Sequence, residues 1–259
     1  MRERVAIVGD GLIGRSIRLA RFRQDPSAAT VSLDRGDSLD ALVDATIVVL
    51  AAPVDAILSL LPSLPALARS ARLVTDTGST KRQIVDAARA AGVATFVAGH
   101  PMAGGTSSGP AGAREALFDG RPWFLLTAQA SPDAVTLATG FVRDLGAVPV
   151  PLDDNGDEHD RLVGAISHLP QVVASALLAR VGESVGPGVK FAGAGLRDTT
   201  RLAASQASVW APILATNAAA VAPLLKALAR DLDAVANGLT DAREIERLFE
   251  RAHRVTFDP

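Results

Sequence analysis

The chain has 259 residues, of which 48% are apolar and 21% are charged, and its formal net charge is −2. A chain of this size can bury one large core or two modest ones, and it lacks the basic surface expected of a protein that binds nucleic acid or a membrane surface. It contains no cysteine, which excludes disulfides, thiolate metal sites and cysteine nucleophiles.

Short β-branched runs alternate with helical patterns over the first 151 residues. This alternation is typical of a doubly wound, mostly parallel sheet, so residues 1–151 are predicted to form an α/β, Rossmann-like dinucleotide-binding domain. Residues 35–45 are too few for the helix and strand that usually follow the second strand, so we expect a trimmed version of this fold. The predicted strands are residues 5–8, 30–33, 46–50, 72–75, 95–98, 123–126 and 148–150, and the predicted helices are residues 13–22, 39–43, 54–61, 83–91 and 132–145.

Residues 152–259 show little strand pattern and are predicted to form an all-α domain. Its long helices are apolar all round, which favours a buried subunit interface, so we expect a homodimer through this domain. No apolar run approaches the roughly 20 residues of a membrane helix, and the first strand begins too early to follow a signal peptide, so we expect a cytoplasmic protein with no membrane partner. The predicted helices are residues 161–181, 199–207, 209–237 and 241–253, with a flexible glycine-containing loop at residues 182–195.

A glycine-rich turn, Gly9-Asp10-Gly11-Leu12-Ile13-Gly14, follows the first predicted strand and opens the first predicted helix. In dinucleotide-binding folds the first glycine allows the tight turn, the second lets the backbone approach the pyrophosphate, and the third lets the helix pack closely on the sheet. The free N–H groups at the helix start then face the phosphates. The turn therefore predicts a dinucleotide held by Gly9, Gly11, Leu12, Ile13 and Gly14.

Asp34 ends the second predicted strand, 20 residues after Gly14. A carboxylate at this position can accept hydrogen bonds from the adenosine ribose and repel a 2′-phosphate, which favours NAD over NADP. Arg35 leaves NADP open, because a guanidinium can hold a 2′-phosphate. The residues that follow the third and fourth predicted strands are also expected beside the cofactor, and these are Ala52, Pro53 and Thr77.

Five further motifs follow the glycine turn. They are Asp76-Thr77-Gly78-Ser79-Thr80-Lys81, His100-Pro101-Met102-Ala103-Gly104, Glu158-His159-Asp160-Arg161, Ser167-His168-Leu169-Pro170 and Arg197-Asp198-Thr199-Thr200-Arg201. In this order the six motifs resemble the prephenate and arogenate dehydrogenases of tyrosine biosynthesis. The resemblance implies a homodimer that uses NAD(P)+ to oxidise C4 of a cyclohexadienol, prephenate or arogenate, while the ring loses CO2 and becomes aromatic as 4-hydroxyphenylpyruvate or tyrosine.

The resemblance also implies roles for individual residues. His100 matches the family's catalytic histidine, and a neutral imidazole is a suitable base for the hydroxyl proton near pH 7. Ser79 matches a serine that would hydrogen-bond the same hydroxyl or the imidazole. Arg201 matches the arginine that holds the ring carboxylate, a role that suits a planar, bidentate guanidinium. His168 matches a second active-site histidine.

Other positions near this predicted substrate site are less regular. Arg197 and Asp198 are expected to place Arg201 and to close the site from the neighbouring subunit, and His159 is interpreted as a structural residue at a helix start. Thr106 stands where many members have an acid, and Gln171 stands where many have a further histidine. Loss of the acid favours the keto acid prephenate, whereas loss of the histidine favours arogenate. The substrate therefore stays open between these two and 4-amino-4-deoxyprephenate, in which an amine replaces the C4 hydroxyl.

Two other classes of protein also stay open. The β-hydroxyacid dehydrogenases share this architecture, but they use a catalytic lysine on the first long helix of the second domain, and residues 161–181 contain no lysine. A non-catalytic NAD-binding sensor or assembly protein is the second alternative, and the joint presence of Ser79, His100 and Arg201 argues against it. The four histidines lack the spacing of a zinc site, so no metal is expected.

Overall fold

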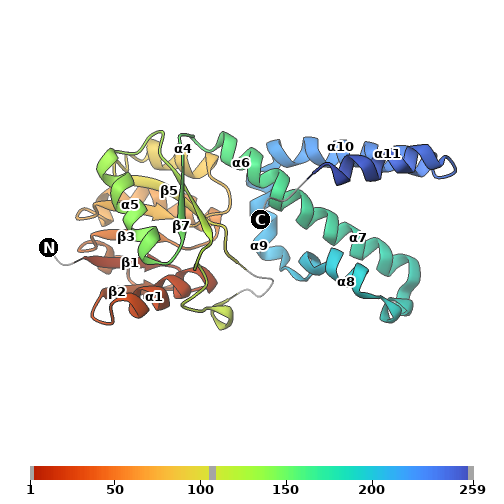
Figure 1. Cartoon of the computed structure of the whole chain (residues 1–259). Helices are drawn as coiled ribbons and strands as arrows, with labels where there is room; N and C mark the ends of the chain where they lie inside the picture. The colour runs from red at the N-terminus through yellow and green to blue at the C-terminus, as the bar shows by residue number, and fades with distance from the viewer. Residues whose placement is uncertain (1–2, 105–108, 256–259) are drawn as a thin grey trace.

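The computed structural model describes residues 3–104 and 109–255. Figure 1 shows an α/β body built from the N-terminal part of the chain, beside a group of long helices built from the C-terminal part. The predicted fold class is confirmed. The chain passes from one body to the other between the last strand, which ends at Leu152, and helix α6, which begins at Asp157.

A seven-stranded sheet forms the centre of the α/β body, in the order β2-β1-β3-β4-β5-β6-β7. Strands β1 to β5 are parallel to their neighbours, β6 runs antiparallel to β5, and β7 is parallel to β6. Strand β2 is an edge strand, and only the short 3-10 turn η1 (Leu39–Leu42) connects it to β3, as expected for the trimmed fold. The strands are β1 Arg4–Val8, β2 Ala29–Leu33, β3 Ile47–Leu50, β4 Leu73–Asp76, β5 Phe96–Pro101, β6 Pro122–Leu126 and β7 Val148–Leu152.

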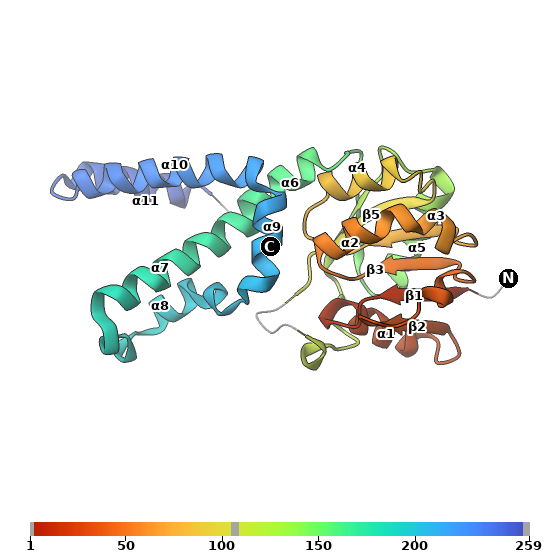
Figure 2. The ribbon, with the colours of Figure 1, turned by 180° about the vertical axis from the view of Figure 1, so that it is seen from behind.

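Helices cover both faces of the sheet. Successive side chains of a strand point to opposite faces, so Val5 and Ile7 pack with helices α1 and α5, whereas Ala6 packs with α2, α3 and α4 on the other face. Figure 2 shows this second face from behind. The helices are α1 Leu12–Gln24, α2 Val54–Leu60, α3 Leu64–Leu67, α4 Arg82–Ala90 and α5 Pro132–Asp144, with the 3-10 turns η2 Leu61–Ser63 and η3 Pro110–Gly112.

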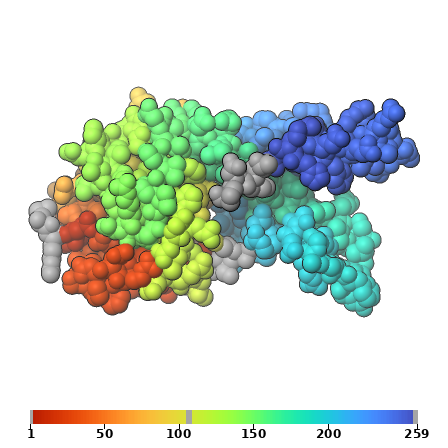
Figure 3. Space-filling view, viewed as in Figure 1, coloured from red at the N-terminus to blue at the C-terminus, as the bar shows by residue number. Residues whose placement is uncertain are grey.

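The helical body begins with one long rod, in which α6 (Asp157–Val163) continues through the π turn η4 (Gly164–His168) into α7 (Leu169–Val185) and the 3-10 turn η5 (Gly186–Phe191). The remaining elements are α8 Ala194–Thr199, η6 Arg201–Ala204, α9 Ala207–Thr216, α10 Ala218–Asn237 and α11 Ala242–His253. In Figures 1 and 3, the arm of α7 and α8 and the arm of α10 and α11 diverge away from the α/β body.

Three expectations for this body are wrong. The helix predicted over residues 199–207 is the end of α8 followed by the 3-10 turn η6, and much of the loop predicted over residues 182–195 is helical. The helix predicted over residues 209–237 is broken between α9 and α10, which meet at a bend of 98°. Asn217 lies at this break, and its buried side chain bonds to the carbonyl oxygen of Asp160 and to His168. These long-range hydrogen bonds explain why the apolar pattern does not continue as one helix.

The expectation that no apolar run approaches the length of a membrane helix is wrong for the long rod. The helix Asp157–Phe191 contains an 18-residue window with a mean hydropathy of 1.6, which is long and apolar enough to cross a membrane, and 28% of that window is buried. Length and composition alone do not separate a membrane helix from an interface helix of a folded domain. Further apolar side chains are exposed on both arms, including Ile166, Val185, Phe191, Leu232, Leu239 and Phe249. The helical body therefore presents an apolar surface that the single chain leaves uncovered.

Candidate active site

Several predicted site residues follow strands whose carboxyl ends lie at one edge of the sheet. The glycine turn follows β1, Ala52 and Pro53 follow β3, and Thr77 and Ser79 follow β4. His100 lies near the end of β5, the neighbour of β4. Ligands of open α/β sheets bind at this edge. Helix α6 begins the helical body beside α4, so the second body lies against the same edge (Figure 1).

The glycine turn has the shape that a dinucleotide requires. Gly9 has φ +109°, and a side chain there would collide with the carbonyl oxygen of Ala51, the residue that follows β3. A side chain at Gly14 would collide with the carbonyl oxygen of Gly9, whereas Gly11 has open space beside it. Helix α1 has no side-chain cap and no acidic residue in its first turn. Its N–H groups are therefore free to bind a pyrophosphate at Gly11.

Asp34 and Arg35 lie beside this turn, because the carbonyl oxygen of Leu33 accepts a hydrogen bond from the N–H of Gly9 at 2.7 Å. Both side chains are exposed. One carboxylate oxygen of Asp34 accepts from the N–H of Arg35 at 2.7 Å. Leu12, Ile13 and Ala52 are partly buried at the same edge, and Pro53 precedes the first turn of α2. The N–H of Thr77 donates to Leu50. The cofactor contacts of these residues stay predictions.

Asp10 of the glycine turn forms a charged pair with Arg15 of helix α1. Asp10 accepts two hydrogen bonds from the guanidinium of Arg15, one of them from Nε at 3.0 Å. The other carboxylate oxygen of Asp10 is buried without a partner among the described residues. The hydrogen bond to Asp10 and the nearby charge of Asp34 raise the pKa of Arg15. Arg15 thus offsets a negative charge at the place where the pyrophosphate is expected.

A buried ion pair connects β4 to the residue before His100. Lys81 and Asp76 are fully buried and form a hydrogen-bonded pair. The ammonium of Lys81 also donates to the carbonyl oxygen of Gly99 at 2.7 Å, and Asp76 accepts from the N–H of Gly99 at 3.1 Å. Burial lowers the pKa of Lys81, although Asp76 opposes this effect. The pair holds both backbone polar groups of Gly99, and thereby the position of His100.

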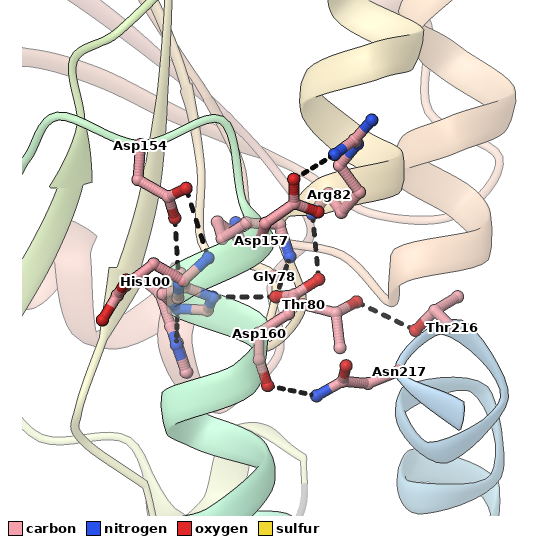
Figure 4. Close-up of polar contacts among 12 residues, drawn as sticks. Gly78, Thr80, Arg82, His100, Asp154, Asp157, Asp160, Thr216 and Asn217 are labelled. Carbon is pink, nitrogen blue, oxygen red and sulfur yellow. Dashed lines mark hydrogen bonds and ion pairs between the residues drawn. The ribbon is translucent and has the colours of Figure 1, made fainter. Parts of the chain in front are cut away.

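His100 is 8% exposed and lies at the start of a chain of hydrogen bonds between side chains. Its Nδ1 is 2.9 Å from Nε2 of His159, and Nδ1 of His159 is 2.8 Å from a carboxylate oxygen of Asp160. Burial lowers the pKa of His100 well below 6.5, and the neighbouring His159 and the ammonium of Lys81 lower it further. His100 is therefore a neutral imidazole near pH 7. Figure 4 shows His100 and Asp160 in this network.

Asp160 connects the two bodies of the molecule. Its carboxylate accepts from the N–H groups of Lys81 at 2.7 Å and Arg82 at 3.0 Å, at the start of helix α4. The guanidinium of Arg82 pairs with Asp157, which lies three residues before Asp160 on α6. Sequence reasoning treated His159 as structural and gave Asp160 no role. The Glu158-His159-Asp160-Arg161 motif was the available signal, but nothing in it indicates that this helix faces His100.

His168 is buried on the other side of Asp160. Its Nδ1 is 3.0 Å from the amide nitrogen of Asn217, which also donates to the carbonyl oxygen of Asp160 at 2.7 Å. The ring of Trp210 meets His168 edge-on, with 5.7 Å between the ring centroids. Burial lowers the pKa of His168 to about 4, although Asp160 opposes this effect. A second neutral imidazole therefore lies at the junction of α6, α9 and α10.

The remaining predicted residues lie farther into the helical body. Gln171 is buried on α7, where its amide nitrogen donates to the carbonyl oxygen of Leu202 at 2.8 Å and its amide oxygen accepts from Ser205 at 3.3 Å. Gln171 thus attaches the turn η6 to α7. Three predicted residues, Arg197, Asp198 and Arg201, are exposed, and none forms an ion pair within the described ranges. Ser79 is half-buried after β4, and Thr106 lies outside the described residues.

Both bodies of the molecule are similar to known proteins. Residues 12–150 match the prephenate dehydrogenase nucleotide-binding domain, and residues 155–252 match the prephenate dehydrogenase dimerization domain. The chain is 32% identical to prephenate dehydrogenase of Bacillus subtilis, an alignment that covers 97% of this chain and 75% of the relative. Arogenate dehydrogenase of Synechocystis is 26% identical, with a TM-score of 0.78 and coverage of 96% and 97%. Prephenate dehydrogenase from A. aeolicus, in complex with hydroxyphenyl propionate and NAD+, shares the fold with a TM-score of 0.86 at 23% identity and coverage of 98% and 97%.

Proposed function

The chain belongs to the prephenate dehydrogenase family, and on this premise we propose that His100, Ser79 and Arg201 carry its reaction. It is an NAD-dependent dehydrogenase that oxidatively decarboxylates a cyclohexadienyl substrate. The observation that carries the assignment of His100 is its buried, neutral imidazole near the end of β5 where the two bodies meet. A neutral imidazole at this edge lies beside the expected nicotinamide and can accept a proton.

The residues of this chain have to hold the substrate and move one proton. When bound, NAD+ supplies the acceptor for the hydride that leaves C4. His100 accepts the proton of the C4 hydroxyl, so that a carbonyl forms as the hydride leaves. The ring carboxyl group then departs as CO2, and its bonding electrons enter the ring to give a phenolate. His100 returns its proton to the phenolate oxygen, so the overall conversion releases no net proton.

Other residues act on binding and orientation in this proposal. Ser79 follows β4, the strand beside β5, and its hydroxyl orients the C4 hydroxyl toward His100. Arg201 holds the ring carboxylate through two parallel hydrogen bonds until CO2 leaves. Arg197 and Asp198 close the site from the neighbouring subunit, and His168 belongs to the substrate site. The residues that hold NAD+ are Gly9, Gly11, Leu12, Ile13, Gly14, Asp34, Arg35, Ala52, Pro53 and Thr77.

We also propose a cytoplasmic homodimer. The matched dimerization domain and the uncovered apolar side chains of the two diverging arms support the dimer. Phe191 is 82% exposed and Phe249 is 61% exposed in the single chain. Exposed apolar surface is typical of subunit interfaces, where aromatic residues are enriched. In the proposed dimer, Arg197 and Asp198 of one subunit close the active site of the other subunit.

The activity is tested by NADH formation with prephenate, arogenate and 4-amino-4-deoxyprephenate in parallel, each with NAD+ and with NADP+. His100→Asn is expected to lower kcat by roughly 10²–10⁴-fold, because that is what a positioned base contributes, and to leave the Kd for NAD+ unchanged. His253→Asn, at an exposed position on α11, is the matched control and keeps wild-type kcat. Full activity of His100→Asn would assign the base to another residue. No NADH from any substrate would contradict the dehydrogenase assignment.

A further inference from the structure

The hydrogen bonds between His100, His159 and Asp160 have only one consistent arrangement of protons. A carboxylate accepts hydrogen bonds and donates none, so Nδ1 of His159 carries the proton in its 2.8 Å contact with Asp160. Burial lowers the pKa of His159, so this ring is neutral and its Nε2 is an acceptor. The group that donates to this Nε2 at 2.9 Å is then Nδ1 of His100. A neutral His100 that donates through Nδ1 has its lone pair on Nε2.

We propose that Asp160, acting through His159, is a positioning residue that sets the tautomer of His100 and makes Nε2 of His100 the proton-accepting atom. This inference rests on the proposed function of His100 as the base. In the reaction, the bond between the substrate oxygen and its proton breaks and a bond from that proton to Nε2 of His100 forms. The imidazolium that results keeps its Nδ1 hydrogen bond to His159, and Asp160 stabilises its positive charge through the intervening ring.

Asp160 is well suited to this role because several hydrogen bonds hold it in place. Its carboxylate receives the N–H groups of Lys81 and Arg82 as well as the ring of His159. Its backbone carbonyl receives the amide of Asn217. The backbone N–H groups of Lys81 and Arg82 can only donate, so both carboxylate oxygens of Asp160 act as acceptors. The acceptor at the end of the chain is therefore fixed, and the protons of both rings follow from it.

The α/β body and the helical body each supply part of this arrangement. His100 and the N–H groups of Lys81 and Arg82 belong to the α/β body, whereas His159 and Asp160 belong to helix α6. The ring of His159 also meets Phe124 of β6 edge-on, with 5.6 Å between centroids, which restricts its rotation. The correct tautomer of His100 therefore depends on the packing of α6 against the sheet.

The tautomer can be measured directly by NMR of protein labelled with ¹⁵N-histidine, because the chain has only four histidines to assign. In the wild-type protein with NAD+ and no substrate, His100 and His159 are both expected to carry their proton on Nδ1. Asp160→Asn places an amide where the carboxylate was, and an amide nitrogen can donate to Nδ1 of His159. This reversal is expected to move the proton of His100 to Nε2 and to lower kcat by roughly 10²–10⁴-fold with KM within about threefold.

Asp154→Asn is the matched control. Asp154 caps the same helix by accepting from the backbone N–H groups of Glu158 and His159, whereas the ring nitrogens of His159 bond to His100 and Asp160. This variant is expected to keep the wild-type tautomers and a kcat within about threefold of the wild type. An equal loss of kcat in both variants, with unchanged tautomers, would show that Asp160 acts only on helix α6 and would overturn the proposal.

A second variant covers the case in which Asp160→Asn does not fold. His159→Phe keeps a ring of similar size and leaves Asp160 bound to the start of α4, but it removes the acceptor for Nδ1 of His100. His100 is then expected to show a mixture of both tautomers, with a lower kcat. A wild-type His100 that carries its proton on Nε2 overturns the inference whatever the activities are. Because the NMR measurement needs no turnover, it decides this inference even where the proposed function fails.

Discussion

Asp10 and Arg15 are charged residues at the place where the cofactor pyrophosphate is expected. A negative charge such as that of Asp10 is unfavourable beside a phosphate-binding turn. The structure pairs it with Arg15 through two hydrogen bonds. The pair is partly exposed, so its direct contribution to stability is small. Its consequence for the turn is electrostatic, because it cancels a charge that would repel NAD+.

Arg15→Gln is therefore expected to weaken NAD+ binding by roughly tenfold, because Asp10 then faces the pyrophosphate as an uncompensated charge. Adding Asp10→Asn to this variant removes that charge and is expected to bring the Kd for NAD+ within about threefold of the wild type. Titration calorimetry of the enzyme with NAD+, without substrate, measures both. A double variant as weak as Arg15→Gln would mean that Arg15 contacts the cofactor itself.

At the scale of an element, Gln171 connects the turn η6 to helix α7. It was expected beside the substrate, but both ends of its amide hold the turn η6, on which Arg201 lies, against helix α7. Its influence on the substrate, in our interpretation, passes through the position of Arg201. Loss of the amide would leave the carbonyl oxygen of Leu202 without this partner.

Gln171→Leu is expected to raise KM by roughly threefold to thirtyfold with a smaller change in kcat, because a buried hydrogen bond that fixes η6 is lost. Arg201→Gln should shift KM in the same direction. Ser175→Ala, which removes a neighbouring hydroxyl whose hydrogen bonds both go to Gln171, is the control. Steady-state kinetics with the best substrate measure all three variants. An unchanged KM in Gln171→Leu would separate η6 from substrate binding.

At the scale of the whole molecule, the two bodies meet through buried polar groups rather than through apolar packing alone. Three of the four histidines, His100, His159 and His168, are buried at this junction. Burial is the largest cause of the lowered pKa of each. Each ring is therefore neutral in the folded protein but takes up a proton near pH 6.5 when the chain unfolds.

The unfolded chain consequently binds more protons than the folded protein at pH values below about 6.5. The contribution of the three neutral rings to the free energy of unfolding is therefore fully present above this pH and is lost as the pH falls. For His168 the window extends from 6.5 down to about 4. Each of the three rings is expected to contribute a slope of up to about 1.4 kcal/mol per pH unit to the free energy of unfolding. Urea unfolding at a series of pH values from about 7.5 to about 5 measures how the free energy of unfolding changes with pH.

His168→Gln can keep the hydrogen bond to Asn217 through its amide oxygen and removes one titrating ring. It is expected to lower the pH dependence of the free energy of unfolding by the contribution of one ring, up to about 1.4 kcal/mol per pH unit. His253→Gln, at an exposed position on α11, is the control for a histidine replaced outside the junction. A stability that is constant from pH 7.5 to pH 5, within about 0.5 kcal/mol, would contradict the assignment of buried neutral rings at the junction.

Most of the fold could be predicted from local patterns. The strands of the sheet match their predicted positions within a few residues, because apolar β-branched runs bounded by turn residues depend little on distant contacts. The helical body was predicted less well at its breaks. The bend at Asn217 results from hydrogen bonds to Asp160 and His168, which lie 57 and 49 residues away along the chain. No periodicity in the sequence records such contacts.

The sequence by itself determined the α/β class, the helical second half, the dinucleotide turn and the motif that carries His100. These features are local, since each follows from the spacing of apolar residues, glycines or motif residues along one segment. Only the tertiary structure decided that a chain of hydrogen bonds runs from His100 through His159 to Asp160. It also decided that Lys81 and Asp76 hold Gly99 and that Gln171 holds η6. The physical reason is that a buried polar group must find a partner, and that partner is set by how helix packs on sheet and helix on helix.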